Sequence, residues 1–126
     1  MTYNIDESII ARSIDHYGEE IQATVCMEEC AELIQAISKM IRRNDELSEE
    51  DYDHLEEEVA DVLICVEMLK QIYSIQDLNI NEWIERKQKR MTNRIVVKDD
   101  GSCDKHTAHK ESWRDVMLRQ FMRRLW

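Results

Sequence analysis

The chain has 126 residues, no proline, only two glycines and a formal net charge of −10. Strand-rich folds use glycine and proline in their many turns, so this composition favours an all-α fold in a single domain. No apolar run is as long as a membrane span, and no signal peptide precedes the first polar residues, so we expect a cytoplasmic protein. The four cysteines lack disulfide-type spacing, and the three inside predicted helices are expected to be buried free thiols.

The negative charge is concentrated in the first three quarters of the chain. Residues 1–95 hold 10 Lys and Arg against 22 Asp and Glu, whereas residues 96–126 hold 7 against 5. Nucleic-acid-binding proteins present basic surfaces to the phosphate backbone, so we expect no nucleic-acid partner. A phosphorylated small molecule is compatible with the acidic part of the chain if divalent cations lie between the two.

Hydrophobic periodicity predicts two helices in the first third of the chain. A short helix over residues 8–17 ends near Gly18, and a long helix follows over residues 19–43. Apolar residues recur in the long helix every three or four positions, which is typical of one helical face. The apolar positions predicted to share this face are Ile21, Val25, Leu33, Ile37 and Ile41.

Two further helices are predicted after a break at residues 44–48. The third covers residues 49–73, and Ser48 with Asp51 resembles a capping box in which Asp replaces Glu. The fourth covers residues 79–94 with Asn79 as its cap, and residues 95–98 are predicted to be extended. The apolar face predicted for the third helix consists of Leu55, Val59, Val62, Val66 and Leu69.

The predicted architecture is a four-helix-type bundle over residues 1–95 and a C-terminal extension over residues 96–126. The extension includes a predicted basic amphipathic helix over residues 110–126. A helical domain of this size buries little apolar surface alone, so we expect association of chains to complete the bundle. The expected assembly is a homodimer or a homotetramer.

Two of the predicted helices each carry a pair of acids beside apolar positions. Glu29 and Glu32 share a face of the second helix, and Glu58 and Asp61 share a face of the third. An ionised carboxylate that is buried without a partner is strongly destabilising, and residues 45–61 contain ten acids and no Lys or Arg. A divalent cation is therefore the expected partner, and Mg²⁺ prefers carboxylate oxygens.

The same acids have a simpler interpretation. Glutamate is a common helix former, and acidic helices usually present a solvated surface. The alternative to an enzyme is therefore a non-catalytic helical adaptor whose acids are surface charge or a relic site. The two hypotheses differ in whether the four acids converge on one cation.

The acidic motifs resemble those of a known family. They are EECAE at residues 28–32 and EVAD at residues 58–61, with 25 residues between Glu32 and Glu58. This arrangement is similar to the E-E-x-x-E … E-x-x-D signature of the all-α NTP pyrophosphatases, the MazG-like superfamily, which includes dimeric dUTPases and phosphoribosyl-ATP pyrophosphatases. The resemblance covers about residues 17–95, and the flanking sequences are similar to those of small phage and Gram-positive members.

The resemblance implies a Mg²⁺-dependent pyrophosphohydrolase, with Mn²⁺ as a substitute cation. Such an enzyme cleaves the α–β bond of a nucleoside triphosphate, giving a nucleoside monophosphate and pyrophosphate. Glu28 is implied as a further metal ligand or as the base that orients the attacking water. The implied metal ligands are Glu29, Glu32, Glu58 and Asp61.

The fourth helix has a basic face that the resemblance connects to the substrate. Lys87 replaces an apolar residue in the predicted apolar line, and Arg90 and Arg94 flank it at helical spacing. Long basic side chains often pass an apolar edge to reach solvent, so the pattern also has a purely structural explanation. Its similarity to the basic C-terminal helix of phage-type members implies contacts with the β- and γ-phosphates.

The sequence offers three candidates for a pocket that binds the nucleotide base. Gln22 and Asn79 carry amides, and Trp83 carries a large aromatic ring. We expect Trp83 to pack within the bundle, as large aromatic side chains usually do. The identity of the base does not follow from these residues.

Overall fold

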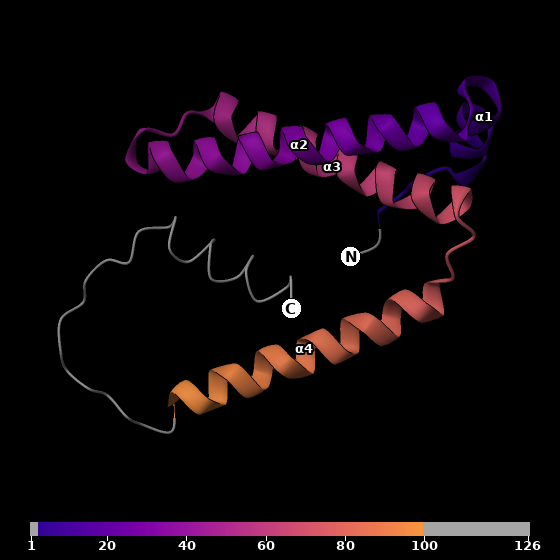
Figure 1. Ribbon diagram of the computed structural model, residues 1–126. Coiled ribbons are helices and arrows are strands. Elements are labelled where there is room, and N and C mark those ends of the chain that lie inside the picture. Colours follow the sequence, from indigo (N-terminus) through magenta and orange to yellow (C-terminus); the bar gives the residue numbers. More distant parts are fainter. Residues whose placement is uncertain (1–2, 100–126) are drawn as a thin grey trace. The chain divides into compact units, whose positions relative to one another are not determined.

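The computed structural model describes the backbone of residues 3–99 and the side chains of residues 3–95. These residues form an all-α structure, as predicted, with no strand among them (Figure 1). The chain divides into two compact units, residues 1–85 and 86–126. The four α-helices are α1 (Glu7–Tyr17), α2 (Glu19–Arg43), α3 (Glu49–Ile72) and α4 (Asp77–Asp99).

A single glycine separates α1 from α2. Asp6 caps α1 by accepting from the backbone N–H of Ser8 at 2.9 Å. At the other end, the N–H of Gly18 donates to the carbonyl of Ile14 at 2.8 Å. Gly18 has φ of 93°, a conformation that L side chains rarely adopt, so α2 begins at once in a new direction.

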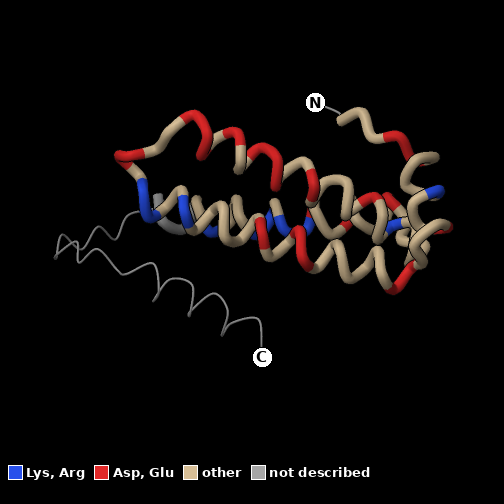
Figure 2. Tube along the Cα trace, turned by 90° about the horizontal axis from the view of Figure 1, so that it is seen from above, with Lys and Arg blue, Asp and Glu red and all other residues tan. Residues whose placement is uncertain are grey.

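The predicted capping box at the start of α3 is confirmed. The chain leaves α2 through Asn44, whose φ is 24°, and forms a short 3₁₀ helix over Asn44–Glu46. The Asp51 carboxylate then accepts from the Ser48 N–H at 2.9 Å, while the Ser48 hydroxyl accepts from the Asp51 N–H at 3.4 Å. Acidic residues gather along the first half of α3 (Figure 2), and those in its first turn interact favourably with the helix dipole.

Helices α2 and α3 lie side by side and run in opposite directions, and α1 covers the end where α2 begins and α3 finishes (Figure 1). The core at this end consists of Ile10, Cys26, Cys65 and Met68. The Cys26 thiol donates to the Cys65 carbonyl at 3.7 Å. Burial raises the pKa of the Cys65 thiol to about 12, so it stays protonated at neutral pH. Cys26 and Cys65 are buried free thiols, as predicted, whereas Cys30 is free but exposed, contrary to the expected burial.

The apolar face predicted for α2 is only partly the face that packs. Val25 and Leu33 are half-buried, but Ile21 is 56 % exposed, and Ile37 and Ile41 are 44 % and 43 % exposed. These three isoleucines stay exposed in the single chain because α2 meets α3 through a neighbouring face of the helix. The buried residues of that face are Gln22, Cys26 and Ala36.

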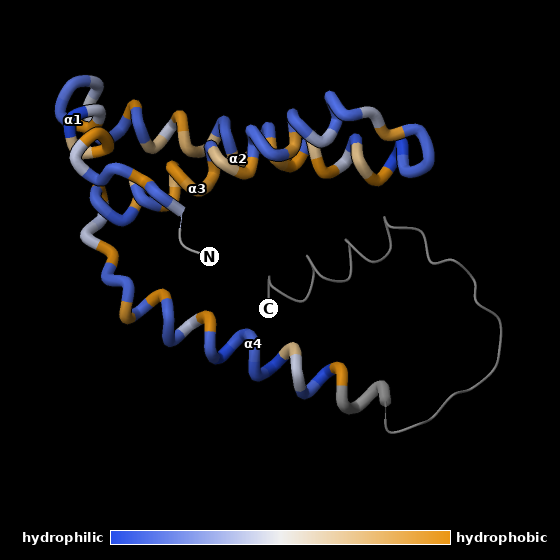
Figure 3. Tube along the Cα trace, turned by 180° about the vertical axis from the view of Figure 1, so that it is seen from behind, coloured by the Kyte–Doolittle hydropathy of each residue, from blue (hydrophilic) through white to orange (hydrophobic). Residues whose placement is uncertain are grey.

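On α3, too, the packed face differs from the predicted apolar face. Val59 and Val66 of the predicted apolar face are 41 % and 46 % exposed, whereas Cys65 and Met68 are buried. Apolar positions recur along both α2 and α3 (Figure 3). Within the described residues only five apolar side chains are buried, so a single chain leaves much of this apolar surface in contact with water.

Helix α4 is longer than predicted at both ends. It begins at Asp77 rather than after Asn79, and it continues through residues 95–98, which were wrongly predicted to be extended. The segment contains neither glycine nor proline to end a helix, and β-branched valines lower helix propensity only slightly. The Asp77 carboxylate lies 2.8 Å from Nζ of Lys70 on α3. The helix predicted over residues 110–126 lies outside the described residues.

None of the described helices combines the length and the apolar character that crossing a membrane requires.

Candidate metal centre

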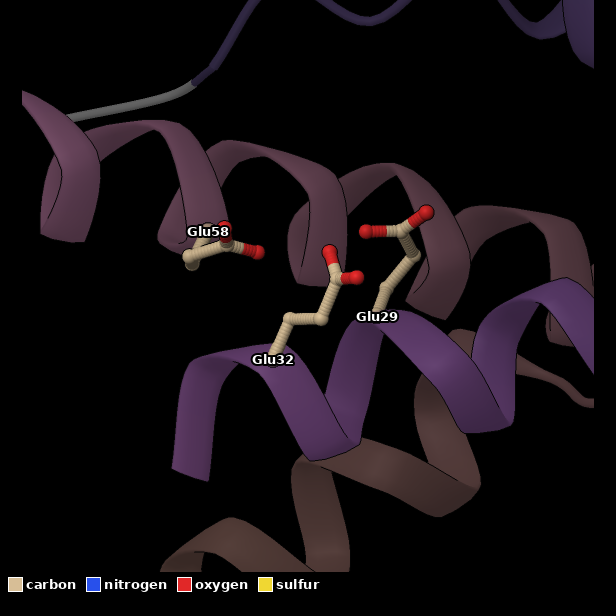
Figure 4. Close-up of side chains that lie close together, drawn as sticks. All are labelled: Glu29, Glu32 and Glu58. Carbon is tan, nitrogen blue, oxygen red and sulfur yellow. The ribbon is translucent and has the colours of Figure 1, made fainter. Parts of the chain in front are cut away.

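Three of the predicted metal ligands lie together across the α2–α3 pair. Glu29 and Glu32 project from α2 and Glu58 projects from α3, and the three carboxylates face one another (Figure 4). Each offers an oxygen within 4.8 Å of the oxygens of the other two. Ionised carboxylates this close repel one another, and burial strengthens the repulsion, so a proton or a cation among them would stabilise the group.

Helical spacing accounts for the position of these acids. Glu29 is three residues after the buried Cys26, so it falls on the face of α2 that packs against α3. Glu58 is seven residues after the buried Asp51 and seven before the buried Cys65, which places it on the packed face of α3. The face that would carry apolar residues in an ordinary helix pair carries carboxylates here.

Glu58 is the most buried of the three acids, at 4 % exposure. Its Oε2 atom is buried and has no hydrogen-bond partner among the described residues. Burial, and then the negative charge of Glu32, raise the pKa of Glu58; Asp61 and Glu57 act in the same sense. His54, whose Nδ1 lies 3.3 Å from Glu58 Oε1, acts in the opposite sense. The chain thus buries a carboxylate oxygen that a ligand from outside could satisfy.

Glu29, on α2, has surroundings similar to those of Glu58. Burial raises the pKa of Glu29, and the charges of Asp61, Glu32 and Glu58 raise it further. The three clustered acids therefore share one region of negative potential. A cation at this place would lower the free energy of every ionised carboxylate around it.

Asp61 and Glu28 border the cluster without belonging to the group of three. Asp61 is half-buried, and among the charged neighbours its effect on the pKa of Glu29 is the largest. Glu28 is exposed and makes a smaller contribution to the same shift. Both predicted residues thus lie within electrostatic range of the cluster.

The residues of the cluster fit a hard divalent cation. The three donors are carboxylate oxygens, the ligand type that Mg²⁺ and Mn²⁺ prefer. Glu32 is exposed, so the cluster is open to solvent on one side, while Glu58 closes the other side. Two basic residues near the end of α2 bind a different acid: Lys39 and Arg43 lie 2.7 and 3.1 Å from the Asp51 carboxylate.

The predicted substrate-binding residues have different surroundings. Lys87, Arg90 and Arg94 are exposed on α4, and their spacing of three and four residues places them on one face of that helix. Gln22 is buried at 6 % exposure, so its contact with a nucleotide base stays a prediction. Trp83 is 53 % exposed, which is more than a side chain packed within the bundle would be.

One residue beside the site was missed in the sequence. His54 precedes Glu58 by four residues, and this helical spacing brings the imidazole against the carboxylate. A search for histidines four residues before or after each predicted ligand would have found it.

Comparison with known proteins agrees with this geometry. A family model described as the MazG nucleotide pyrophosphohydrolase domain matches residues 18–95, more than half of the chain. The matched region contains α2, α3 and the acids of both helices. No curated protein and no solved structure matches the chain. The extent of the family match is sufficient to assign membership: the chain belongs to the family of MazG nucleotide pyrophosphohydrolase domains.

Proposed function

We propose that this protein is a cytoplasmic, Mg²⁺-dependent nucleoside triphosphate pyrophosphohydrolase. The reaction converts a nucleoside triphosphate and water into a nucleoside monophosphate and pyrophosphate. The observation that carries the proposal is the buried Oε2 of Glu58, which has no hydrogen-bond partner within residues 3–95 and lies in a group with two carboxylates of α2, in a chain of the MazG family.

In this proposal Glu29, Glu32, Glu58 and Asp61 hold the cation. Support comes from the raised pKa values of Glu29 and Glu58, since both reflect burial and mutual repulsion that a dication would relieve. A bound Mg²⁺, or Mn²⁺ in its place, supplies positive charge that offsets the charge of the phosphates and polarises the phosphoryl group. The acids fix the position of that charge at the α2–α3 interface.

Glu28 is assigned to the attacking water. Glu28 is exposed and lies beside the cluster in sequence, outside the group of three carboxylates, so its carboxylate is free to face solvent. A carboxylate in reach of the water accepts its proton as the oxygen bonds to the α-phosphorus. The bond from the α-phosphorus to the bridging oxygen breaks, and pyrophosphate leaves with the electron pair.

The basic face of α4 is assigned to the β- and γ-phosphates. Lys87, Arg90 and Arg94 share this face and are exposed, so their cationic groups are available to an anionic ligand. Arginine guanidinium groups bind phosphate oxygens through two parallel N–H donors. Gln22 remains the candidate for a contact with the base.

We also propose that the enzyme is a homodimer or homotetramer. A second apolar line on α2, with spacings of three and four residues, stays exposed in the single chain. Met27 and Ile34 are 73 % and 66 % exposed, and such a line is typical of a helix that packs against another helix. A second copy is the expected occupant. The residues of this line are Met27, Cys30, Ile34, Ile37 and Ile41.

The test is pyrophosphate release across a panel of NTPs and dNTPs, with Mg²⁺ and with EDTA. At least one triphosphate should be cleaved to its monophosphate only when the cation is present. Glu58→Gln should lower turnover at least about a hundredfold, because it removes one charged ligand and keeps the side-chain shape. Glu56→Gln, which removes an equivalent charge from an exposed position of α3, is the matched control. Absence of cation-dependent cleavage for every triphosphate would instead support an adaptor.

A further inference from the structure

His54 occupies a specific position relative to the buried acid of the cluster. It lies one helical turn before Glu58 on α3, and its Nδ1 is 3.3 Å from Glu58 Oε1. The histidine side chain is 46 % exposed, whereas that of Glu58 is 5 % exposed. A partly exposed imidazole therefore contacts one oxygen of a nearly buried carboxylate.

The two oxygens of Glu58 consequently differ. Oε1 has the imidazole nitrogen beside it, and Oε2 is buried without a hydrogen-bond partner among the described residues. Among the neighbouring charges with the largest effects on the pKa of Glu58, those of Glu32, Asp61 and Glu57 repel the ionised carboxylate, whereas that of His54 favours it.

We infer that His54 is a positioning residue for the cation site: its Nδ1 holds Oε1 of Glu58, and Oε2 is thereby left available as a ligand oxygen. This inference rests on the proposed function, because it concerns a ligand of the proposed cation. It adds to the acidic motifs a residue that touches neither the cation nor the substrate and acts through Glu58.

In this inference Nδ1 donates to Oε1, and such a donor would restrict rotation of the carboxylate about its last bond. The ligand oxygen is then already oriented before the cation arrives, so less conformational entropy is lost on binding. The contact does not depend on a charged imidazole, because a neutral ring with its proton on Nδ1 also presents a donor. Groups that orient metal ligands in this way typically contribute a factor of about 10–100 to metal affinity.

The experiment compares Mn²⁺ binding by four purified variants in the absence of nucleotide, using isothermal titration calorimetry. His54→Leu replaces the imidazole with an apolar side chain of similar size and so removes the donor. His54→Asn restores an N–H donor, because the Asn amide nitrogen is the same number of bonds from the backbone as Nδ1. His16→Leu, at an exposed position of α1, controls for the loss of a histidine elsewhere. Glu58→Gln tests the site itself.

His54→Leu should bind Mn²⁺ at least about tenfold more weakly than the wild type, and His54→Asn should recover most of the loss. His16→Leu should bind as the wild type does. In turnover assays His54→Leu should need more Mn²⁺ for half-maximal activity, while kcat at saturating Mn²⁺ should stay within about threefold of the wild-type value. This division between cation requirement and kcat distinguishes positioning of a ligand from a general loss of structure.

Two results would overturn the inference while leaving the proposed function intact. The first is wild-type Mn²⁺ affinity in His54→Leu together with loss of binding in Glu58→Gln. The second is equal weakening in His54→Asn and His54→Leu, which would show that an Nδ1-like donor is not what matters. Wild-type affinity in Glu58→Gln would overturn the cation site, and the role of His54 with it.

Discussion

Glu32 on α2 and Glu58 on α3 present carboxylate oxygens within 4.8 Å of each other across the helix interface. The charge of Glu32 is the largest Coulombic contribution to the raised pKa of Glu58. Two acids placed in this way destabilise the metal-free protein, because folding brings like charges together and buries one of them. The arrangement is therefore costly for stability, and a bound cation would offset that cost.

The first prediction concerns Glu58→Gln in metal-free protein. Removing the buried charge should raise the melting temperature in EDTA at pH 7 by about 3 °C, because the repulsion from Glu32 and Asp61 disappears. The same variant should lose the rise in melting temperature that millimolar Mg²⁺ produces in the wild type. Differential scanning fluorimetry with EDTA and with Mg²⁺ measures both effects. A lower melting temperature in EDTA would indicate that Glu58 is a structural acid.

The second prediction is the pH dependence of the metal-free protein. Glu29 and Glu58 have pKa values raised above 4.5 in the folded state, so the folded protein binds more protons than the unfolded chain in the interval between the two values. Stability should therefore fall as pH rises from 4.5 through the raised pKa values. Urea midpoints measured in EDTA between about pH 4 and pH 7 test this. The double variant Glu29→Gln with Glu58→Gln should show a flatter profile.

The third prediction concerns Asp51, which is 2 % exposed and connects the end of α2 to the start of α3 through its ion pairs and a hydrogen bond. Its carboxylate binds Lys39 and Arg43 and accepts from the Ser48 N–H. Asp51→Asn should lower the melting temperature at pH 7 by about 5 °C or more, because it leaves two cations without their anion. Asp53→Asn, at an exposed position nearby, should change it little.

The same variant has a specific pH signature. The hydrogen bond from the side chain of Lys39, followed by that from the Ser48 backbone, lowers the pKa of Asp51 from 3.8. The stability that the ionised carboxylate contributes is fully present above 3.8 and is lost as pH falls below that value. The difference in stability between the wild type and Asp51→Asn should therefore become smaller below about pH 3.8. A constant difference down to pH 2 would contradict the assignment.

Sequence periodicity was sufficient to predict the helices and the start of α3. The bounds of α2 were predicted correctly, and the Ser48–Asp51 capping box has the predicted partners. Both features depend on local chemistry: apolar spacing, side-chain capping, and residues that end helices. The convergence of Glu29, Glu32 and Glu58 also followed from spacing once α2 and α3 were paired.

The packed faces were harder to predict because α2 carries two apolar lines. Ile21 and Gln22 are adjacent in sequence, and hydrophobicity favours the first, yet Gln22 is buried and Ile21 is exposed. Which of the two apolar lines packs against α3 depends on the chain directions set by the backbone at Gly18 and Asn44. It also depends on which surface contacts the other line. The continuation of α4 beyond residue 94 was missed because valines favour strands by propensity, while the uninterrupted helix before them favours continuation.

The fourth prediction concerns the basic face of α4. Arg90→Ala should raise KM for a cleaved triphosphate by about tenfold or more, because it removes a two-donor contact with a phosphate group. The affinity for Mn²⁺ without nucleotide should not change, since Arg90 belongs to the proposed phosphate contacts and not to the cation ligands. Steady-state kinetics and calorimetry measure the two quantities.

The control for this variant is Lys89→Ala, which removes a charge from an exposed position on a different side of α4. It should alter KM by less than about twofold. If Lys89→Ala and Arg90→Ala raise KM equally, Arg90 contributes to substrate affinity only through the net charge of α4, and no specific phosphate contact exists at Arg90.

The last prediction concerns the exposed apolar line of α2. Ile34 is 66 % exposed, so Ile34→Glu should not disturb the interior of the single chain, but it would place a charge in the middle of a helix–helix interface. Light scattering coupled to size-exclusion chromatography should give the mass of a multimer for the wild type and a smaller mass for Ile34→Glu. Ile9→Glu, at a similarly exposed position of α1, should keep the wild-type mass. A multimer that persists in Ile34→Glu would mean that chains associate through another surface.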